Sequence, residues 1–308
     1  MSPLTGHAAW GWSDLLRCHR LENPLLLQYV CYATWGAGYA ALDPRSGPDG
    51  SLVLVVVANL LGIVAGNLLN SGADVDTDAA GGDKRHIAHA ARRLGRRRLS
   101  RWAAVEIAGC LGLAAWAAVS TGKPLLVLIA ALLVAGQVAY NLEPLRLKRR
   151  GLVGQIALGV QLGALPFLMT HHAAVPEVAG WALVVAAGFA AQAVSRALWW
   201  SVPDVGADRV TGIITPAVLR GTSWTVGAAV WANALGAVLV VAGVWAGLGA
   251  VPALVAAAVC GLVLVDQVLL RSSGPRLWSM MPTGLRRPGN MVRAVLANVA
   301  LAAVPLVA

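Results

Sequence analysis

The apolar run "LVLVVVANLLGIVAGNLL" at residues 52–69 is followed directly by "NSGADVDTD" at residues 70–78. About 20 predominantly apolar residues in a helix cross the hydrocarbon core of a bilayer, so the first stretch predicts a membrane-spanning helix. The asparagine and the three aspartates lie where that helix reaches water. Together the two stretches predict a helix that delivers acidic side chains to the membrane surface.

The composition of the whole chain agrees with a membrane protein. The chain has 308 residues, of which 58% are hydrophobic and 12% charged, and its mean hydropathy is +0.69. Such values lie outside the range of soluble domains. Nine apolar stretches are long enough to span a bilayer, at residues 24–42, 51–69, 103–121, 124–142, 152–170, 178–198, 224–246, 249–270 and 290–307. We therefore expect an all-α polytopic membrane protein with about nine transmembrane helices. It should form one domain over residues 1–308, with residues 1–20 as an N-terminal cytoplasmic segment.

The distribution of basic residues predicts the orientation. The net charge of +10 is compatible with nucleic-acid binding, but the charges follow the predicted topology. Of the 24 Lys and Arg residues, only Arg45 and Lys123 fall in loops opposite the N-terminus. Because cytoplasmic loops of membrane proteins carry an excess of Lys and Arg, the N-terminus is expected in the cytoplasm and the C-terminus outside. We expect an integral protein of a bacterial cell membrane, in contact with the lipid bilayer and with no nucleic-acid partner.

The acidic stretch has helical spacing. Asn70, Asp74 and Asp78 stand at i, i+4 and i+8, which places them on one helix face, and Asp76 points away from that face. Two carboxylates at this spacing repel each other, and acids at a helix C-terminus oppose the helix macrodipole. A divalent cation between them would remove both penalties.

A second acidic pair follows the sixth predicted span. In "SVPDVGADRVTG" at residues 201–212, Asp204 and Asp208 repeat the i, i+4 spacing on the same predicted side of the membrane. Mg²⁺ binds through a few carboxylates and completes its coordination with water and substrate phosphate oxygens. The two pairs therefore predict a site where metal ions and an anionic substrate bind together.

Basic residues near the acidic motifs could hold the anion. The candidates for a diphosphate group are Lys84 and Arg85, behind the first acidic motif, and Arg146 and Lys148, in "YNLEPLRLKRRG" at residues 140–151. A ligand with a diphosphate head and a long apolar tail fits both this charge and the apolar helices.

These motifs resemble those of the UbiA superfamily of intramembrane prenyltransferases. Members carry N-x-x-x-D-x-x-x-D after the second helix and D-x-x-x-D after the sixth, similar to "NSGADVDTD" and "DVGAD" here. The loop "YNLEPLRLKRRG" and the stretch "DRVTGIITPAVLRG" at 208–221 are also similar to family segments. The chain departs from many members at Ser71, where they have an acidic residue.

The resemblance implies a bundle of nine helices around a central cavity with a cytoplasmic mouth. At the mouth, Asp74, Asp78, Asp204 and Asp208 would bind Mg²⁺, or Mn²⁺ as a substitute, and Asn70 and the basic candidates would bind an isoprenyl diphosphate. Departure of the diphosphate would leave an allylic carbocation, to which Tyr140 offers a π face. A lipophilic or aromatic acceptor would then attack the cation.

Two alternative functions remain. A UbiA-type terpene cyclase would release diphosphate with no acceptor, and a transporter would use the acids for ion coupling. A fixed cation or hydrogen-bond donor aimed at an acceptor would favour prenyl transfer over cyclisation. Polar residues inside the predicted spans include Glu106, Gln155, Gln161, Gln192, Asn233 and Asn298. Such groups are costly in lipid unless they face the protein interior, although contacts between helices would account for them equally well.

Overall fold

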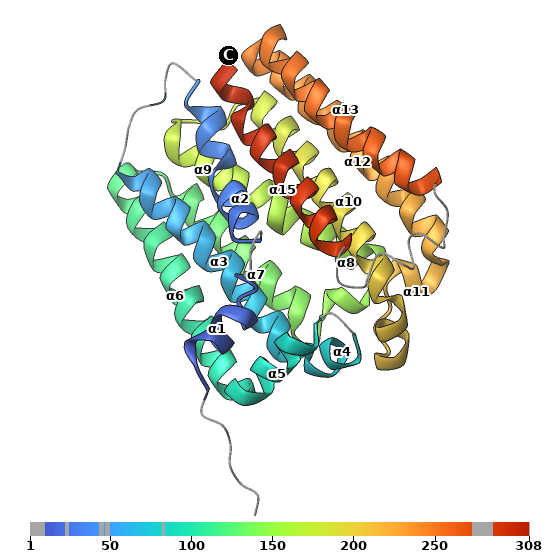
Figure 1. The fold of residues 1–308 in the computed structure, drawn as a ribbon. Coiled ribbons are helices and arrows are strands. Elements are labelled where there is room, and N and C mark those ends of the chain that lie inside the picture. Colours follow the sequence, from blue (N-terminus) through green and yellow to red (C-terminus); the bar gives the residue numbers. More distant parts are fainter. Residues whose placement is uncertain are drawn as a thin grey trace, which may run out of the picture.

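The computed structural model describes residues 10–21, 25–42, 46, 50–81, 84–272 and 286–307, and the regular structure in these ranges is helical throughout. The side chains of residues 286–294 and 307 are outside the description. Figure 1 shows long helices running roughly alongside one another, with short helices at one end of the bundle.

Among the described residues, six helices are long and apolar enough to cross a membrane. They are α3 (Ser51–Ala73), α6 (Arg96–Thr121), the continuous segment of α8 (Leu152–Gly159), η2 (Val160–Ala164) and α9 (Leu165–Ala174), α10 (Gly180–Thr211), α12 (Thr222–Leu248) and α13 (Ala250–Ser272). Three further helices are shorter or less apolar, namely α2 (Leu25–Ala40), α7 (Leu125–Asn141) and α15 (Arg286–Ala303), which is followed by η3 (Val304–Val307). These helical segments follow the order of the predicted spans, and the expectation of an all-helical polytopic membrane protein is confirmed. The largest difference in length is α10, which continues to Thr211, whereas the predicted span ends at residue 198.

Close packing around α10 depends on glycines. A Cβ added at Gly188 of α10 would lie 2.9 Å from the Gly236 carbonyl oxygen of α12, and a Cβ at Gly236 would lie 2.8 Å from the Gly188 carbonyl oxygen. The two backbones therefore touch where these glycines meet, as small residues allow in membrane helices. This contact fixes α10, which carries the second acidic motif, against α12.

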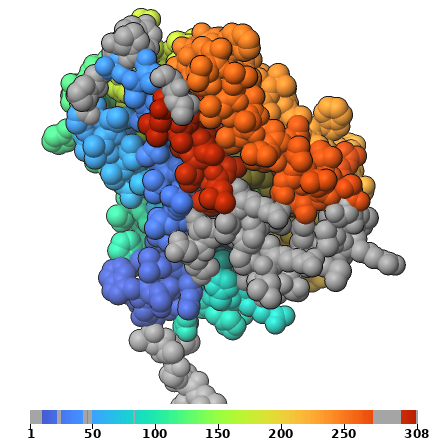
Figure 2. Space-filling view, turned by 45° about the horizontal axis from the view of Figure 1, so that its top comes forward, coloured from blue at the N-terminus to red at the C-terminus, as the bar shows by residue number. Residues whose placement is uncertain are grey.

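Helix α2 lies against α9 and α15. A Cβ at Gly36 of α2 would fall 1.9 Å from the Phe167 carbonyl oxygen of α9, so α2 meets the α9 backbone directly. On the face in Figure 2, α15 lies between α2 and α13. The Trp35 indole nitrogen donates a 3.1 Å hydrogen bond to the Asn298 carbonyl oxygen and thereby ties α2 to α15.

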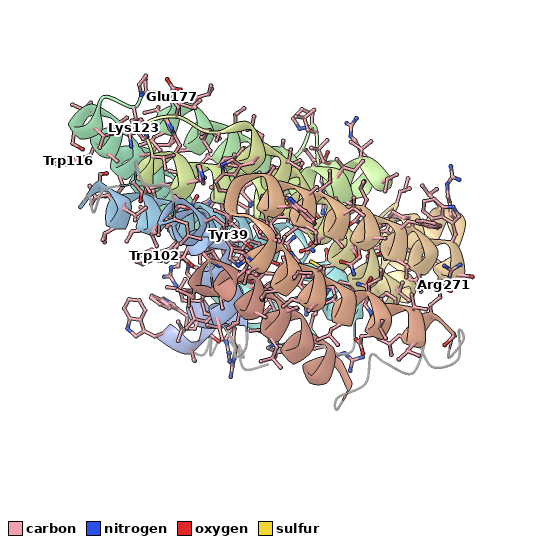
Figure 3. The ribbon with its side chains drawn as sticks, turned by 90° about the horizontal axis from the view of Figure 1, so that it is seen from above. Tyr39, Trp102, Trp116, Lys123, Glu177 and Arg271 are labelled. Carbon is pink, nitrogen blue, oxygen red and sulfur yellow. The ribbon has the colours of Figure 1, made fainter. Side chains whose placement is uncertain are left out.

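The outer surface of the bundle is apolar. Large side chains such as Trp116, Val119 and Leu262 are more than two-thirds exposed, at 71%, 87% and 73%. Helices that face lipid need such side chains, because lipid tails solvate them as well as a protein core does. Lys123 and Glu177 lie together at one side of the molecule, and Arg271 lies at the other (Figure 3).

The short helices gather at the end of the bundle where α3 and α10 carry their acidic residues (Figure 1). They are α1 (Trp12–Cys18), α4 (Val75–Ala80), α5 (Arg85–Leu94), η1 (Leu147–Arg149) and α11 (Pro216–Arg220). Helix α5 packs on α1 and α4, and α4 packs on α10. Glu106 of α6 accepts a 2.5 Å hydrogen bond from the ring of His19, which follows α1. This contact accounts for one of the polar residues predicted inside the spans.

Candidate active site

The first acidic motif bends where α3 gives way to α4. Asp74 ends α3 and precedes α4 with φ −109° and ψ 17°, so the predicted single helix is broken at this residue. The i to i−4 bonds nevertheless continue, since the Asp74 amide donates to Asn70 at 2.9 Å and the Asp78 amide to Asp74 at 2.8 Å. Asp74 and Asp78 are 1% and 2% exposed. The Asp76 side chain is 95% exposed and lies 3.8 Å from Arg92, so it points away as the spacing predicts.

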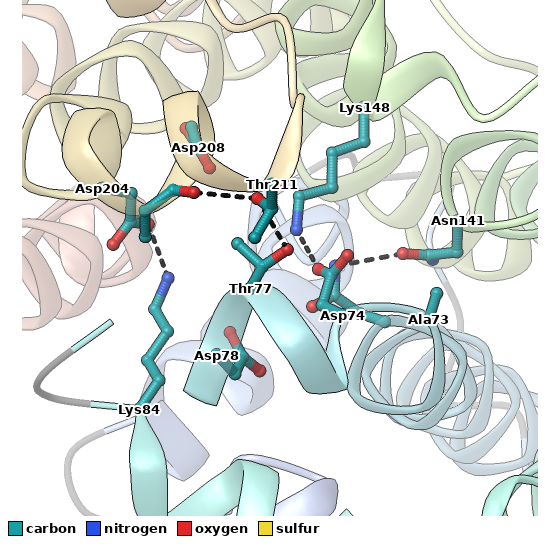
Figure 4. Close-up of polar contacts among 12 residues, drawn as sticks. Ala73, Asp74, Thr77, Asp78, Lys84, Asn141, Lys148, Asp204, Asp208 and Thr211 are labelled. Carbon is teal, nitrogen blue, oxygen red and sulfur yellow. Dashed lines mark hydrogen bonds and ion pairs between the residues drawn. The ribbon is translucent and has the colours of Figure 1, made fainter. Parts of the chain in front are cut away.

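The second acidic motif lies inside the last turns of α10. Asp208 is buried and accepts a 3.2 Å hydrogen bond from the Thr215 hydroxyl. Gly212, with φ +69°, ends the helix in the left-handed conformation that glycine adopts without strain. The Thr77 hydroxyl donates to the Thr211 hydroxyl at 3.2 Å. This bond joins the two motifs, and Figure 4 shows them on either side of it.

Basic side chains contact the aspartates of both motifs. The Lys148 ammonium forms an ion pair with Asp74, and Lys84 lies 2.5 Å from Asp204 (Figure 4). Arg146 donates to the Ala73 carbonyl oxygen at 3.0 Å and lies 3.5 Å from Asp74. Three of the four predicted basic residues therefore border the acidic site.

The charges of this cluster perturb one another. Burial by itself would raise the pKa of the Asp74 carboxyl, but the Lys148 ammonium and its hydrogen bond, with help from Arg20 and Lys84, hold that pKa below its usual value. Burial by itself would likewise lower the pKa of Lys148. The nearby Asp74 carboxylate has the larger effect, so the pKa of Lys148 lies above its usual value. Both groups are therefore charged at neutral pH. The site presents fixed charges of both signs.

Arg85 does not share this arrangement. It begins α5 with an exposed side chain, and no ion pair in the described part of the chain links it to any of the four aspartates. The spacing of Lys84 and Arg85 explains the difference, because neighbouring residues at a helix start point in different directions. Tyr140, in contrast, is buried at the end of α7, close to Lys148.

Two residues of the site were missed in the sequence. Arg20, in the turn after α1, donates to the Asn70 side chain at 2.7 Å and lies 3.4 Å from Asp78. Asn141 accepts a 3.0 Å hydrogen bond from the Asn70 amide. Asn141 stands beside Tyr140 in a quoted motif and so could have been identified. Arg20 belongs to no motif, and only its place before the first span set it apart.

Ser71 has a structural contact. Its side chain is fully buried, and its hydroxyl donates a 2.8 Å hydrogen bond to the carbonyl oxygen of Cys18. This bond holds the end of α1 against α3 and so helps to place Arg20. At the position where the family pattern has an acidic residue, this chain therefore has a serine that packs α1 against α3.

The donor set fits hard divalent cations and a phosphate group. Four carboxylates supply the oxygen ligands that Mg²⁺ prefers, and two of them belong to each motif. In the described residues no three acidic, His or Cys side chains converge on one point. Within the part of the chain that the structure describes, the Nε atoms of Arg20 and Arg146 are buried and have no hydrogen-bond partner. Buried donors without partners are rare in proteins. These two N–H groups could donate hydrogen bonds to a bound oxyanion.

Comparison with solved structures shows the same fold. A UbiA homolog from Archaeoglobus fulgidus, solved with DMAPP and Mg²⁺, aligns with a TM-score of 0.65 at 15% identity, over 96% of this chain and 100% of that chain. The apo UbiA homolog from Aeropyrum pernix K1 aligns with a TM-score of 0.64 at 21% identity, over 91% of this chain and 94% of that chain. A structure of digeranylgeranylglyceryl phosphate synthase aligns with a TM-score of 0.65 at 14% identity, over 95% and 97% of the two chains.

Sequence comparison gives the family. A search of curated protein sequences finds no match. The sequence profile of the UbiA prenyltransferase family matches residues 30–281. With its multiple apolar spans and this match over most of its length, the chain is an integral membrane enzyme that belongs to the UbiA prenyltransferase family.

Proposed function

We propose that the chain is a Mg²⁺-dependent prenyltransferase that ionises an isoprenyl diphosphate and transfers the prenyl group to an aromatic or quinone-type acceptor. One observation carries this proposal. Two pairs of aspartates from different helices meet across the Thr77–Thr211 hydrogen bond, and Lys and Arg side chains border both pairs. Carboxylates alone would suit a cation, whereas carboxylates interleaved with basic groups suit a metal-bound anion.

The basic residues would bind and stabilise the leaving group. As the allylic C–O bond breaks, its electron pair leaves with the diphosphate, so negative charge develops on that group. Lys148, Arg146 and Arg20 would place positive charge and N–H donors where this charge develops, which is the largest contribution that a preorganised site makes to many reactions. An acceptor carbon then supplies the electron pair of the new C–C bond and loses its proton to solvent.

The aspartates would hold the metal ions. Asp74, Asp78, Asp204 and Asp208 supply the oxygen ligands, and a bound Mg²⁺ or Mn²⁺ would neutralise charge on the departing diphosphate. The cations that now contact these carboxylates would then be free to contact phosphate oxygens. The solved relative from Archaeoglobus fulgidus is described as bound to GPP and Mg²⁺, which supports this pairing of ligands.

The apolar helices would keep water from the allylic cation. Asn70 would be held by Arg20 and Asn141 at the edge of the site, and the buried Tyr140 ring would face the cation through its π system. Burial of the Tyr140 ring removes competing solvent from that side of the site. A cation formed there would react with an acceptor before it met water.

The orientation completes the proposal. The acidic site lies at the end of the bundle where most of the basic residues gather, and this end would face the cytoplasm. The C-terminus would then lie outside. Soluble diphosphates would enter from the cytoplasmic side, and lipophilic acceptors would enter from the bilayer.

A product assay separates the possible reactions. The purified protein is incubated in detergent with geranyl diphosphate and Mg²⁺, with and without a panel of hydroxylated aromatic acceptors, and the organic extract is analysed by mass spectrometry. A prenylated acceptor is the expected product. A cyclic terpene formed equally well without acceptor would identify a cyclase, and absence of both products would contradict the proposal.

A further inference from the structure

An acidic residue lies inside the membrane-spanning part of α6. Glu106 falls one turn inside the predicted span 103–121, and its side chain is only 11% exposed. Acidic residues within membrane spans are rare, and as a rule they have a defined partner and a function. The Glu106 Oε1 atom lies 2.5 Å from the His19 ring, and within the described chain the buried Oε2 atom has no hydrogen-bond partner. The carboxylate of Glu106 is therefore directed at His19.

The His19 ring is held at both of its nitrogen atoms. Nδ1 donates a 2.8 Å hydrogen bond to the Leu15 carbonyl oxygen, one turn back in α1, and Nε2 contacts Glu106. The His19 carbonyl oxygen accepts a 2.9 Å hydrogen bond from the Asn67 side chain of α3. Helices α1, α3 and α6 thus meet at the residue that immediately precedes Arg20.

Arg20 lies in a turn where glycine is the usual residue. The Arg20 amide donates to the Arg17 carbonyl oxygen at 2.9 Å and the Leu21 amide to that of Leu16 at 3.1 Å, which are the hydrogen bonds of a Schellman motif at the end of α1. Arg20 has φ +56°, the left-handed conformation that glycine supplies at this position without strain. A residue with a Cβ adopts it at an energetic cost, so tertiary contacts must maintain the turn.

The same backbone conformation occurs at a second residue of the site. Among the described residues other than glycine, only Arg20 and Arg146 have a positive φ, at 56° and 33°. Both contact aspartates of the first acidic motif. Backbone strain of this kind gathers at functional sites and persists only where the surrounding contacts over-determine the conformation. The strain at Arg20 therefore points to a side chain whose direction matters and whose turn is held by its neighbours.

We propose that Glu106 is a positioning residue, which holds His19 and thereby keeps Arg20 directed at the acidic site. This inference rests on the proposed function, because the anion that Arg20 would bind there is the diphosphate. Arg20 donates to Asn70 at 2.7 Å and lies 3.4 Å from Asp78. Without Glu106 the His19 ring loses its contact with α6, and the strained turn can relax and withdraw the guanidinium from the site.

A double-mutant cycle separates positioning from general stability. Equilibrium dialysis of the purified protein measures binding of the unreactive analogue geranyl thiolodiphosphate in the presence of Mg²⁺. Arg20→Gln should weaken this binding about tenfold, in keeping with a lost hydrogen bond between charged groups. Glu106→Ala should weaken it about fivefold in the wild-type background and less than about twofold in Arg20→Gln, because its effect passes through Arg20.

Two further variants serve as rescue and control. Glu106→Gln keeps a side-chain oxygen that can accept a hydrogen bond from the His19 ring, so it should recover most of the binding. Arg93→Gln removes the ion pair that ties α5 to Asp14 of α1, and it should bind the analogue like the wild type. Melting temperatures show that each variant has folded.

Chemical modification gives a readout that needs no ligand. Phenylglyoxal reacts with accessible guanidinium groups, and peptide mass spectrometry identifies the arginine that has been modified. The Arg20 side chain is 21% exposed and should react several-fold faster in Glu106→Ala than in the wild type. Arg17, with a side chain that is 42% exposed, should react at the same rate in both proteins.

The outcomes separate this inference from the proposed function. Equal weakening by Glu106→Ala in both backgrounds, an equal loss in Glu106→Gln, or an unchanged reactivity of Arg20 would overturn the positioning role. Failure of the wild type to bind the thiolodiphosphate would contradict the proposed function instead, and the reaction with phenylglyoxal would still decide whether Glu106 places Arg20.

Discussion

The Lys84 ammonium lies 2.5 Å from the Asp204 carboxylate, so the residue that follows the first acidic motif neutralises an acid of the second. Lys148 does the same for Asp74. Each motif thus holds a basic side chain where a metal ion is proposed to bind. Metal ions and these ammonium groups should therefore compete for the carboxylates.

The competition can be measured at Lys84. Lys84→Gln removes one competitor of the metal, and Mn²⁺ should bind about two- to fivefold more tightly in the absence of diphosphate, the range expected for a partly exposed ion pair. The KM for geranyl diphosphate should rise, because a ligand of the anion is lost. Mn²⁺ binding is followed by electron paramagnetic resonance. Arg92→Gln, which removes the partner of the exposed Asp76, is the control, and unchanged or weaker Mn²⁺ binding in Lys84→Gln would refute the competition.

Arg20 should stabilise the site before substrate binds. Arg20→Gln leaves the buried Asp78 carboxylate without its charged partner and should cost about 1–3 kcal/mol of unfolding free energy. Mg²⁺ should restore part of the loss, because a cation at Asp78 replaces the missing charge. Melting temperatures with and without Mg²⁺ report both effects, and Arg20→Lys should recover part of the stability. Equal Mg²⁺ stabilisation of the wild type and of Arg20→Gln would argue against a metal at Asp78.

Ser71 should affect stability and not chemistry. Ser71→Ala removes the hydrogen bond to Cys18 and should lower the unfolding free energy by about 1 kcal/mol, with turnover maintained. Ser71→Asp places a carboxylate in a fully buried position against a carbonyl oxygen and should reduce the yield of folded protein. Thermal denaturation and turnover are measured together. A Ser71→Ala protein with normal stability and little turnover would show that the hydroxyl takes part in the reaction.

The sequence predicted the membrane helices and the paired acids because both depend on local spacing. The length of the apolar stretches predicted the membrane spans. The i, i+4 spacing predicted that Asp74 and Asp78 share one helix face and that Asp76 points away from it. The break at Asp74 and the length of α10 were not predicted, since helix ends depend on tertiary contacts such as the bond between Thr77 and Thr211.

Long-range contacts were beyond the sequence for the same reason. Nothing in the local pattern shows that Arg20 reaches Asn70 or which of Lys84 and Arg85 reaches Asp204.

Orientation can be tested with two engineered cysteines. The four native cysteines are buried, whereas Ala80 beside the acidic site and Glu177 at the other side of the molecule are exposed. An impermeant thiol reagent should label Glu177→Cys in intact cells and Ala80→Cys only after the membrane is opened. The reverse pattern would place the acidic site outside the cell.

Metal-dependent release of diphosphate from geranyl diphosphate by the purified protein tests the central claim most directly. The account predicts release with Mg²⁺, none with EDTA, and a loss of at least about a hundredfold in Asp78→Ala, as expected when a preorganised electrostatic partner is removed. Asp76→Ala, two residues away and exposed, should release diphosphate at the wild-type rate. Release that persists in EDTA, or an equal loss in Asp76→Ala and Asp78→Ala, would contradict the account.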